Sequence, residues 1–371
     1  MIYADNAATT QMDVDVFEAM KPYLLHEYGN ASQPYSFARQ PKKAIQEARE
    51  TIASCIGALP EEIYFTSGGT ESDNWAIKGI AFRNYDHRAT ITTAFEHHAV
   101  LHACEAIERL GCPVAYMLPD KRGFVSPDSL ERYITDETFL VSVMYANNEL
   151  GSIQPIKELC KVAHDHGALF HTDAVQAVGH VAINVNDLGV DMLSASAHKF
   201  NGAKGVGFLY IRTGTTLPPY ADGGAQEHGL RAGTENVAGI VSMAVALKKN
   251  VNDLDKNQRH ILKLEGLLLQ ALNKSGIPYV RNGGDHTLPG VISLSFDGKD
   301  GEAILHRMDL MGVCISTGSA CDSKNTEISH VLQAIRMPES LAKGTIRISL
   351  GKNNTADDID TIVTALRKIL L

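Results

Sequence analysis

The chain has 371 residues, of which 44% are hydrophobic and 21% are charged, and this balance is ordinary for a folded globular protein. A chain of this length usually divides into one large domain and a smaller one. The formal net charge of −9 comes from acidic residues scattered along the chain, which argues against nucleic acid or an anionic membrane as a direct partner.

The N-terminus and the cysteines indicate a cytoplasmic protein. The first residues, MIYADNAATT, have neither a basic flank nor an apolar core, and no later stretch is long enough to span a bilayer. The six cysteines form no C-x-x-C pair and are widely dispersed, so we expect reduced thiols. Four of them lie in apolar surroundings and are expected to be buried. The six are Cys55, Cys104, Cys112, Cys160, Cys314 and Cys321.

Between residues 63 and 211, short apolar runs alternate with helical patterns. The runs predicted as strands are IYFTS, ATITTAF, TFLVSVMYA, ALFHTD, DMLSASA and VGFLYI. The stretches between them, such as SDNWAIKGIAF and IKELCKVAHDHG, carry apolar residues at helical spacing. This alternation predicts βαβ units and a mostly parallel sheet.

The pattern changes after Leu217. The Pro- and Gly-rich segment LPPYADGGAQEHGLRAGTEN predicts an ordered loop, and a long helix is expected from Ala238 to about Asn273. The runs VISLSF, VCISTGSAC and TIRISLG then predict the strands of a smaller α+β domain. We place the boundary near residue 255, so that residues 15–255 form the large domain, and residues 1–14 and 256–371 form the small one.

Polar residues follow several of the predicted parallel strands. Because ligands bind at the carboxyl ends of the strands in open α/β sheets, we expect these side chains to share one site. They are His97, Asn148, Asp173, Ser196, His198 and Lys199.

The segment TSGGTES, residues 66–72, follows a strand and opens a helix. Its free backbone N–H groups and the helix dipole could hold a phosphate, although a plain strand-to-helix turn explains it equally well. Neither a P-loop nor a dinucleotide fingerprint is present. The G-x-x-x-x-G-K-[ST] spacing is absent, and Gly205-Val206-Gly207 lacks the remaining glycine.

Lys199 lies at a strand end beside a glycine-rich turn, where exposure on a helix surface explains a lysine poorly. A Schiff-base lysine needs an amine that is neutral for part of the cycle, which burial and a nearby cation can produce. Asp173 is available as the partner of a pyridinium nitrogen, the pairing that makes pyridoxal phosphate an electron sink. These two residues together predict pyridoxal-phosphate chemistry.

Four histidines in HDHGALFHTDAVQAVGH raise the question of a metal site. His164 and His166 fall at a helix end and point in different directions, whereas His171 shares a strand face with Asp173. We therefore expect no metal, and expect His164 and His166 to interact with the helix dipole. The fourth histidine is His180.

Taken together, the motifs closely resemble those of the NifS/IscS cysteine desulfurases, which are class V aminotransferases of pyridoxal-phosphate fold type I. The resemblance runs nearly from end to end. It implies an α/β fold whose large domain has a mostly parallel seven-stranded sheet between helices, pyridoxal 5'-phosphate as cofactor, and a homodimer. The motifs are YADNAATT, TSGGTES, EHHAV, NNELG, HTDAVQ, SASAHKFNG, RAGTEN, STGSAC and TIRISLG.

The resemblance also implies roles for single residues. Lys199 would bind the cofactor as a Schiff base, Asp173 would meet the pyridine nitrogen, and His97 would stack on the ring and assist proton transfer. Gln176 would contact the ring hydroxyl. The implied phosphate contacts are Gly69, Thr70, Ser196 and His198, together with Thr234 from the neighbouring subunit.

Two further residues resemble the contacts to the substrate carboxylate. They are Asn148 and Arg347, and a planar guanidinium suits a two-point grip on a carboxylate. Without the resemblance, Arg347 in TIRISLG would be read as an exposed strand residue.

Cys321 lies in the Ser- and Gly-rich segment STGSACDSKNTE, where small polar neighbours should leave its sulfur accessible. The resemblance implies that it attacks the sulfur of L-cysteine, becomes a persulfide and releases L-alanine. An acceptor protein docking near this loop would take the sulfur for iron-sulfur cluster assembly or thiolation. Gly318 and residues 322–327 would then allow the loop to move. Cys314, on the preceding strand, is expected in the core.

The sequence departs from the family pattern at two positions, and other functions are also compatible with it. Ala203 stands where the family usually has proline, and His228 where it often has arginine. The rivals that would share Lys199 and Asp173 are a selenocysteine lyase, a cysteine-sulfinate desulfinase or another class V aminotransferase. A sulfur-carrier or scaffold-binding protein that has lost catalysis is a rival of another class.

Overall fold

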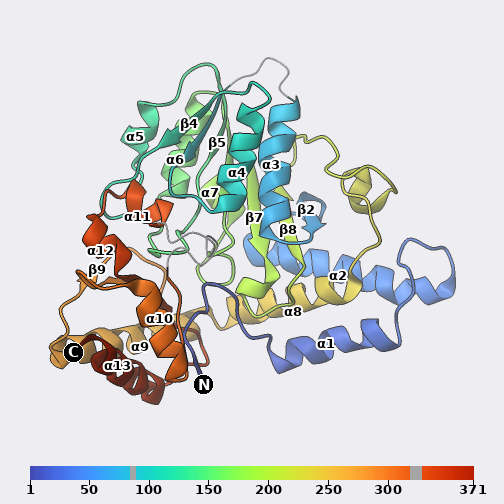
Figure 1. Cartoon of the computed structure of the whole chain (residues 1–371). Coiled ribbons are helices and arrows are strands. Elements are labelled where there is room, and N and C mark those ends of the chain that lie inside the picture. Colours follow the sequence, from blue (N-terminus) through green and yellow to red (C-terminus); the bar gives the residue numbers. More distant parts are fainter. Residues whose placement is uncertain (84–88, 318–327) are drawn as a thin grey trace.

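The computed structural model describes residues 1–83, 89–317 and 328–371, and its centre is a seven-stranded sheet (Figure 1). The strands from β7 to β4 run parallel, whereas β8 is antiparallel to both of its neighbours. The α/β fold and the mostly parallel sheet are therefore confirmed. In sheet order the strands are β2 (Ile63–Thr66), β8 (Gly207–Ile211), β7 (Met192–Ser196), β6 (Leu169–Asp173), β5 (Thr138–Ser142), β3 (Ala89–Thr93) and β4 (Val114–Met117).

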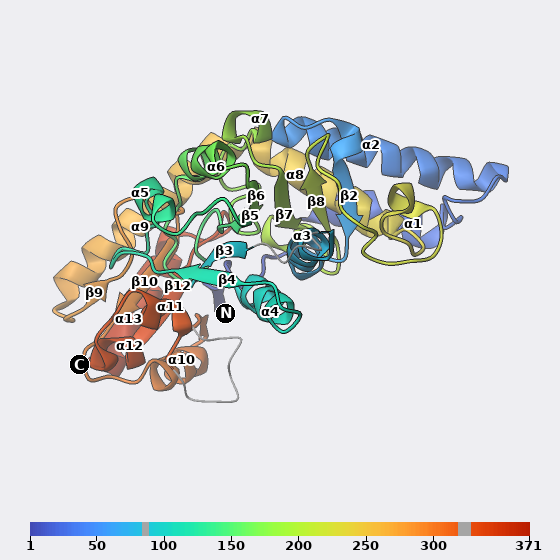
Figure 2. The same ribbon diagram turned by 90° about the horizontal axis from the view of Figure 1, so that it is seen from above.

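Helices cover both faces of this sheet, as Figure 2 shows from above. One face packs against α3 (Gly69–Arg83) and α4 (His98–Glu108) in a core that includes Trp75 and Cys104. The other face is the larger core, and removing it from water is the main term that holds the layers together. Helices contributing to it are α1 (Val14–Leu25), α2 (Arg39–Ile56), α5 (Pro127–Glu131), α6 (Ile156–Asp165), α7 (Val185–Leu188), α8 (Val237–Asn252), α11 (His330–Ala334) and α12 (Glu339–Lys343).

A separate core forms in the C-terminal part of the chain. It lies between the antiparallel sheet β12-β10-β9 and three helices, and β1 (Ile2–Tyr3) pairs with β11 (Val313–Cys314) beside it. Ala4 belongs to this core, which favours the prediction that residues 1–14 go with the smaller domain. The strands are β9 (Val280–Arg281), β10 (Val291–Ser295) and β12 (Thr345–Ser349), and the helices are α9 (Leu254–Ser275), α10 (Gly301–Leu310) and α13 (Ala356–Leu370).

The expected single helix from Ala238 to Asn273 is wrong, because two helices occupy this stretch. α8 ends at Asn252, and α9 begins at Leu254. Between them Asp253 has a backbone ψ of 10°, outside the helical range. Asn and Asp are weak helix formers because their side chains compete for backbone hydrogen bonds, and such residues stand at 250, 252 and 253. The domain boundary near residue 255 stays a prediction.

Other sequence expectations differ less. β4 was not among the predicted strands. It is a strand of only four residues that follows Pro113 and lies at the edge of the sheet, so its sequence pattern is short. The segment 217–236 is irregular as expected, apart from the short 3₁₀ helix η4 (Gln226–Gly229). Among the described residues, no helix is long and apolar enough to cross a bilayer.

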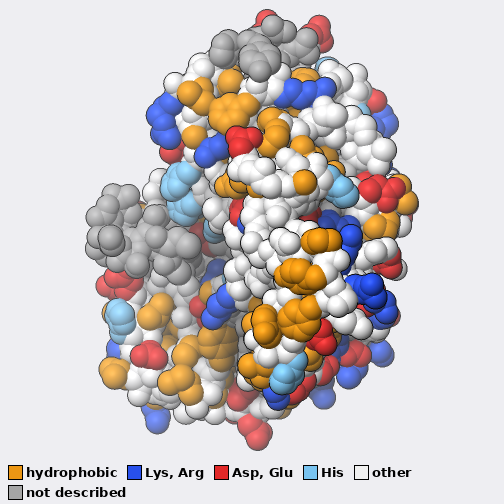
Figure 3. Space-filling view, turned by 90° about the vertical axis from the view of Figure 1, so that its right-hand side faces the viewer, with side chains coloured by type: hydrophobic (Ala, Val, Ile, Leu, Met, Phe, Trp, Pro, Cys, Tyr) orange, Lys and Arg blue, Asp and Glu red, His pale blue; other side chains and the backbone are white. Residues whose placement is uncertain are grey.

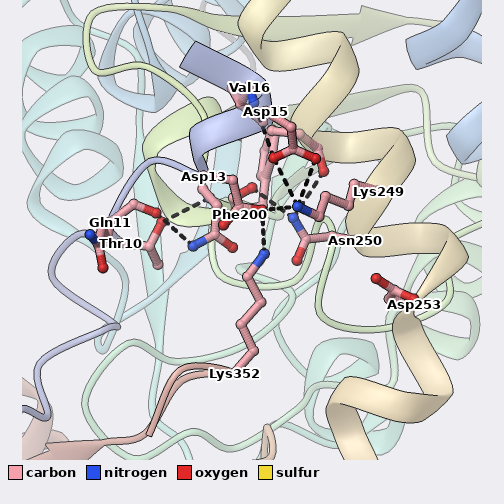
Figure 4. Close-up of polar contacts among 12 residues, drawn as sticks. Thr10, Gln11, Asp13, Asp15, Val16, Phe200, Lys249, Asn250, Asp253 and Lys352 are labelled. Atoms are coloured by element: carbon pink, nitrogen blue, oxygen red, sulfur yellow. Dashed lines mark hydrogen bonds and ion pairs between the residues drawn. The ribbon is translucent and has the colours of Figure 1, made fainter. Parts of the chain in front are cut away.

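The N-terminal segment 4–13 is held against the large sheet and the C-terminal core by a polar cluster (Figure 4). Asp13 pairs with Lys352 at 2.7 Å and with Lys249 of α8 at 3.0 Å. Asn201, two residues beyond Lys199, donates its backbone N–H to Thr10 Oγ1 and its side-chain amide to the Gln11 carbonyl. This docking fixes the segment beside Lys199.

Candidate active site

A cavity of about 560 Å³ opens at the carboxyl ends of the parallel strands. This volume is typical of sites for small molecules. The strands β6 and β7, the turn before α3 and the start of α4 each contribute side chains, so residues from 8 to 205 converge there. Of the predicted site residues it is lined by Gly69, Thr70, His97, Asn148, Asp173, Gln176, Ser196, His198 and Lys199.

One end of the cavity is built from the turn before α3. Gly68 has φ +150°, a conformation that side chains disfavour, and a Cβ at Gly69 would come within 2.5 Å of Val175 Cγ2. Gly207 packs so closely that a Cβ there would lie 2.7 Å from Gly68 Cα. The glycines therefore bring backbone N–H groups at the start of a 15-residue helix to the cavity wall, next to Ser196.

Lys199 ends the short 3₁₀ helix η3 (Ala197–Lys199), which directly follows β7. Its Nζ donates to the carbonyl oxygens of Ala7 at 2.7 Å and Ala8 at 2.8 Å. Gln176 donates its amide to the same Ala7 carbonyl at 3.0 Å. The docked N-terminal segment thus positions the amine, and no motif in the sequence predicted these two carbonyls.

Asp173 is the last residue of β6 and is 5% exposed. Burial raises the pKa of Asp173 to about 6, while a hydrogen bond from the Val175 N–H and the charge of Lys199 oppose that rise. Its carboxylate is therefore ionised at neutral pH and has few competing donors, which suits the binding of a protonated ring nitrogen.

His97 is the N-cap of α4, where its Nδ1 accepts the Ala99 N–H at 3.1 Å. Burial, followed by the charge of Lys199 and by the neighbouring His98, lowers the pKa of His97 to about 4. The ring is therefore neutral near pH 7. The hydrogen bond at Nδ1 leaves Nε2 as the protonated nitrogen.

Arg347 lies in β12 and is 4% exposed, so the reading of an exposed strand residue is wrong. Its guanidinium donates to the Asn148 carbonyl and to Asp5 Oδ1, both at 2.7 Å. The third nitrogen, Nε, has no hydrogen-bond partner in the described part of the chain. Arg347 therefore lies directly behind Asn148, although it does not line the cavity itself.

Thr234, like Arg347, is a predicted site residue that does not line this cavity. Thr234 is exposed and lines a neighbouring hollow, which shares Ser67 and Gly205 with the cavity. Cys321 lies outside the described residues, as do Gly318 and residues 322–327.

The other cysteines and histidines considered in the sequence analysis do not line the cavity where the structure describes them. Cys55, Cys104, Cys160 and Cys314 are reduced thiols, and Cys314 is partly exposed rather than fully in the core. His164 pairs with Asp191 at 2.8 Å and His166 with Glu131 at 3.1 Å, both at the end of α6. In the described ranges, no group of three His, Cys, Asp or Glu side chains could hold a metal ion.

Three buried ionisable groups lie in or beside the cavity, and sequence reasoning had considered only one of them, His171. Asp73 of α3, Glu96 just before His97, and His171 of β6 are each no more than 1% exposed. A carboxyl group at an apolar position of a helix, as in ESDNWAI, was the available signal for Asp73.

Comparison with known proteins identifies the family. The profile of the class V aminotransferases matches residues 2–362. The chain belongs to the class V aminotransferase family. Within this family it is 48% identical over its whole length to the cysteine desulfurase IscS of Dictyoglomus turgidum, covering 94% of that protein. It is 46% identical to the cysteine desulfurase IscS of Methanosarcina thermophila, covering 92%.

Solved structures agree with this assignment to the cysteine desulfurases. A NifS-like protein superposes with a TM-score of 0.94 at 37% identity, covering 100% of this chain and 99% of that one. SspA, solved in complex with cysteine, superposes at 0.86 and 37% identity, covering 96% of this chain and 100% of SspA. The protein is thus a pyridoxal-phosphate-dependent enzyme of this family.

The residues present fit that cofactor. The cavity offers an amine for its aldehyde, a buried carboxylate for its ring nitrogen and a helix N-terminus for its phosphate. The glycines leave the room that a side chain would fill. The departure at Ala203 is compatible with this arrangement, because its N–H donates to Ser242 Oγ at 3.2 Å, a bond that proline could not make.

Proposed function

We propose that this enzyme takes sulfur from L-cysteine, releases L-alanine and carries the sulfur as a persulfide on Cys321. The observation that supports this most is the convergence of Lys199, Asp173 and His97 on one cavity in a chain of the cysteine desulfurase type. A rival aminotransferase would share these three residues, but it has no use for Cys321.

The cofactor would be held by residues from several loops. Lys199 would bind it covalently, Asp173 would pair with the ring nitrogen, and Gln176 would contact the ring hydroxyl. When bound, pyridoxal phosphate supplies an electron sink for the negative charge that develops at the substrate α-carbon. The phosphate contacts would be Gly69, Thr70, Ser196 and His198, with Thr234 contributed by a second subunit.

The chain's own groups would bind the substrate and move its protons. The amine of Lys199, which donates to the Ala7 and Ala8 carbonyls, would take the α-proton once it is released. The neutral His97, whose Nδ1 accepts the Ala99 N–H, would donate from Nε2 and assist proton transfer. Asn148 and Arg347 would contact the substrate carboxylate, with Arg347, which donates to the Asn148 carbonyl from behind the cavity wall, reaching it only after a local rearrangement.

Sulfur transfer would balance without an outside oxidant. The Cys321 thiolate forms an S–S bond to the substrate sulfur as the substrate C–S bond breaks, and the carbon retains that electron pair and takes a proton. Cysteine and a thiol thus become alanine and a persulfide. An acceptor protein with its own thiol would then remove the sulfur for iron-sulfur cluster assembly or thiolation.

The proposal includes a homodimer working in the cytoplasm. Figure 3 looks at the side from which α1 and the start of α2 project in Figure 1, and hydrophobic side chains gather in the lower half of this face. Exposed apolar groups of this kind are typical of interfaces. A reducing compartment suits the dispersed thiols. The exposed large apolar side chains between residues 17 and 37, which we call the α1 patch, are Phe17, Leu24, Leu25, Tyr28, Tyr35 and Phe37.

The decisive experiment measures alanine release from L-cysteine by wild-type and Cys321→Ala protein, with the near-visible absorbance of the bound cofactor recorded for both. We expect the variant to lose activity and keep the absorbance, because the thiol is the acceptor and not a cofactor ligand. Cys314→Ala is the matched control and should retain activity. Equal alanine release by wild type and Cys321→Ala would remove Cys321 from the reaction and favour a lyase or transaminase.

A further inference from the structure

Three buried carboxyl groups lie near one another, and two of them line the cavity. Asp73 of α3 is 1% exposed, Glu96 is fully buried, and Asp173 of β6 is 5% exposed. Asp73 and Asp173 line the same cavity, and their charges repel each other. Two like charges this deeply buried are too costly to coexist without cations to pair with them.

No Lys or Arg of the described residues pairs with Asp73. Its Oδ1 lacks a hydrogen-bond partner among the described residues, and its one ion-pair candidate there is His171 Nε2 at 3.6 Å. That imidazole is already engaged on both sides, by Ser142 Oγ at 2.8 Å and Ser194 Oγ at 3.0 Å. Burial lowers the pKa of His171 to about 3, so the ring is neutral and offers Asp73 no positive charge.

The three carboxyl groups differ in their partners. Asp173 accepts the Val175 N–H and is stabilised by the charge of Lys199, so it is the member that ionises. Burial raises the pKa of Asp73 well above its usual range, and the charge of Asp173 raises it further, while a hydrogen bond from Ser194 opposes both. Burial also raises the pKa of Glu96 to about 8, although the Met144 N–H and the Thr93 hydroxyl donate to it.

We propose that Asp73 is a protonated positioning residue, which leaves Asp173 as the anionic member of this carboxyl cluster. A neutral Asp73 fills its place on the cavity floor without adding charge, so the negative charge stays on the carboxylate that faces the ring nitrogen of the cofactor. The inference rests on the proposed role of Asp173, and not on the identity of the sulfur acceptor or the substrate.

Infrared spectroscopy of the cofactor-loaded enzyme tests the protonation directly, because a carboxylic acid has a carbonyl stretching band that a carboxylate lacks. We expect Asp73→Asn to remove one such band at neutral pH and Glu96→Gln to remove a different one. Asp173→Asn should leave both in place. Retention of every acid band in Asp73→Asn would show that Asp73 is ionised and would overturn the proposal.

Cofactor affinity, followed by the near-visible absorbance, separates charge from shape. Asp73→Ala should weaken cofactor binding by about tenfold, because it removes the carboxyl group to which the buried Ser194 donates a hydrogen bond. The uncharged, isosteric Asp73→Asn should recover most of that loss, whereas Asp173→Asn should not recover binding. An Asp73→Asn enzyme that binds cofactor as poorly as Asp173→Asn would contradict the idea. Neither readout uses L-cysteine, so a failure of the proposed desulfurase reaction would be seen separately, as absent alanine release by the wild type.

Discussion

At the scale of single residues, the surroundings of His97 set the pH range in which it can work. An unperturbed imidazole has a pKa of about 6.5 and would be mostly protonated by about pH 6. Burial and the neighbouring cations lower the pKa of His97 to about 4. A lowered pKa means that the ring gives up its proton at a lower pH and stays neutral throughout the physiological range.

We therefore expect kcat/KM for alanine release to show no acid limb from His97 between about pH 5 and pH 8. A pH profile of the wild type, recorded beside His97→Gln, tests this. His97→Gln should lower activity by a similar factor at every pH in that window. A wild-type transition near pH 6.5 that disappears in His97→Gln would show that the ring titrates normally.

At the scale of secondary-structure elements, the N-terminal segment 4–13 matters because it carries the carbonyl groups that hold Lys199. The segment has little regular structure: Asp5 forms an isolated bridge with Ser349, residues 6–8 form a turn, and residues 9–13 belong to no helix or strand. Its position depends on polar contacts with distant parts of the chain, chiefly those of Asp13 with Lys352 and Lys249. Asp13 is 10% exposed and Lys352 is 17% exposed, so solvent screens this pair only partly.

Asp13→Asn should lower the free energy of unfolding by about 1–3 kcal/mol, because it leaves Lys352 without its charged partner in a partly buried place. Lys249 is 36% exposed and loses less. Urea denaturation of the two proteins measures the difference. Glu18→Gln is the matched control, since its pair with Lys21 is about half exposed and is worth at most about 1 kcal/mol. Equal stability of wild type and Asp13→Asn would show that the polar cluster does not hold the segment.

At the scale of the whole molecule, the cavity lies where the large sheet, the N-terminal segment and the neighbourhood of β12 meet. Thr234 lines the adjoining hollow of its own chain and is exposed to solvent. If a second subunit supplies Thr234, the site is complete only in a dimer. The α1 patch is then the surface to test. It contains Tyr28 and Phe37, whose rings meet edge to face with their centroids 5.1 Å apart.

We expect wild-type protein to be a dimer by light scattering, and the double variant Tyr28→Asp with Phe37→Asp to be largely monomeric and to bind cofactor more weakly. Burying two new carboxylates in an apolar interface is unfavourable. Leu310→Asp is the control, because Leu310 is 87% exposed on α10, far along the chain from the α1 patch. A monomeric wild type with full cofactor occupancy would contradict the proposed dimer.

The sequence by itself determined six of the seven strands of the large sheet, the cofactor and the family. Strands and motifs are local features. Apolar runs that alternate with helical patterns, and short motifs such as SASAHKFNG, are formed by neighbouring residues and can therefore be recognised in the sequence. The roles of Lys199, Asp173 and Cys321 stay predictions, although the first two line one cavity.

Only the tertiary structure decided features that depend on contacts between distant residues. The Ala7 and Ala8 carbonyls meet Lys199 across more than 190 positions, and Arg347 is buried because Asp5 and Asn148 reach it from other segments. The surroundings of the buried Asp73 likewise depend on β6, which brings His171 to 3.6 Å from its Oδ1. Burial and charge are properties of the assembled neighbourhood, and therefore no periodicity or spacing along the chain could have predicted them.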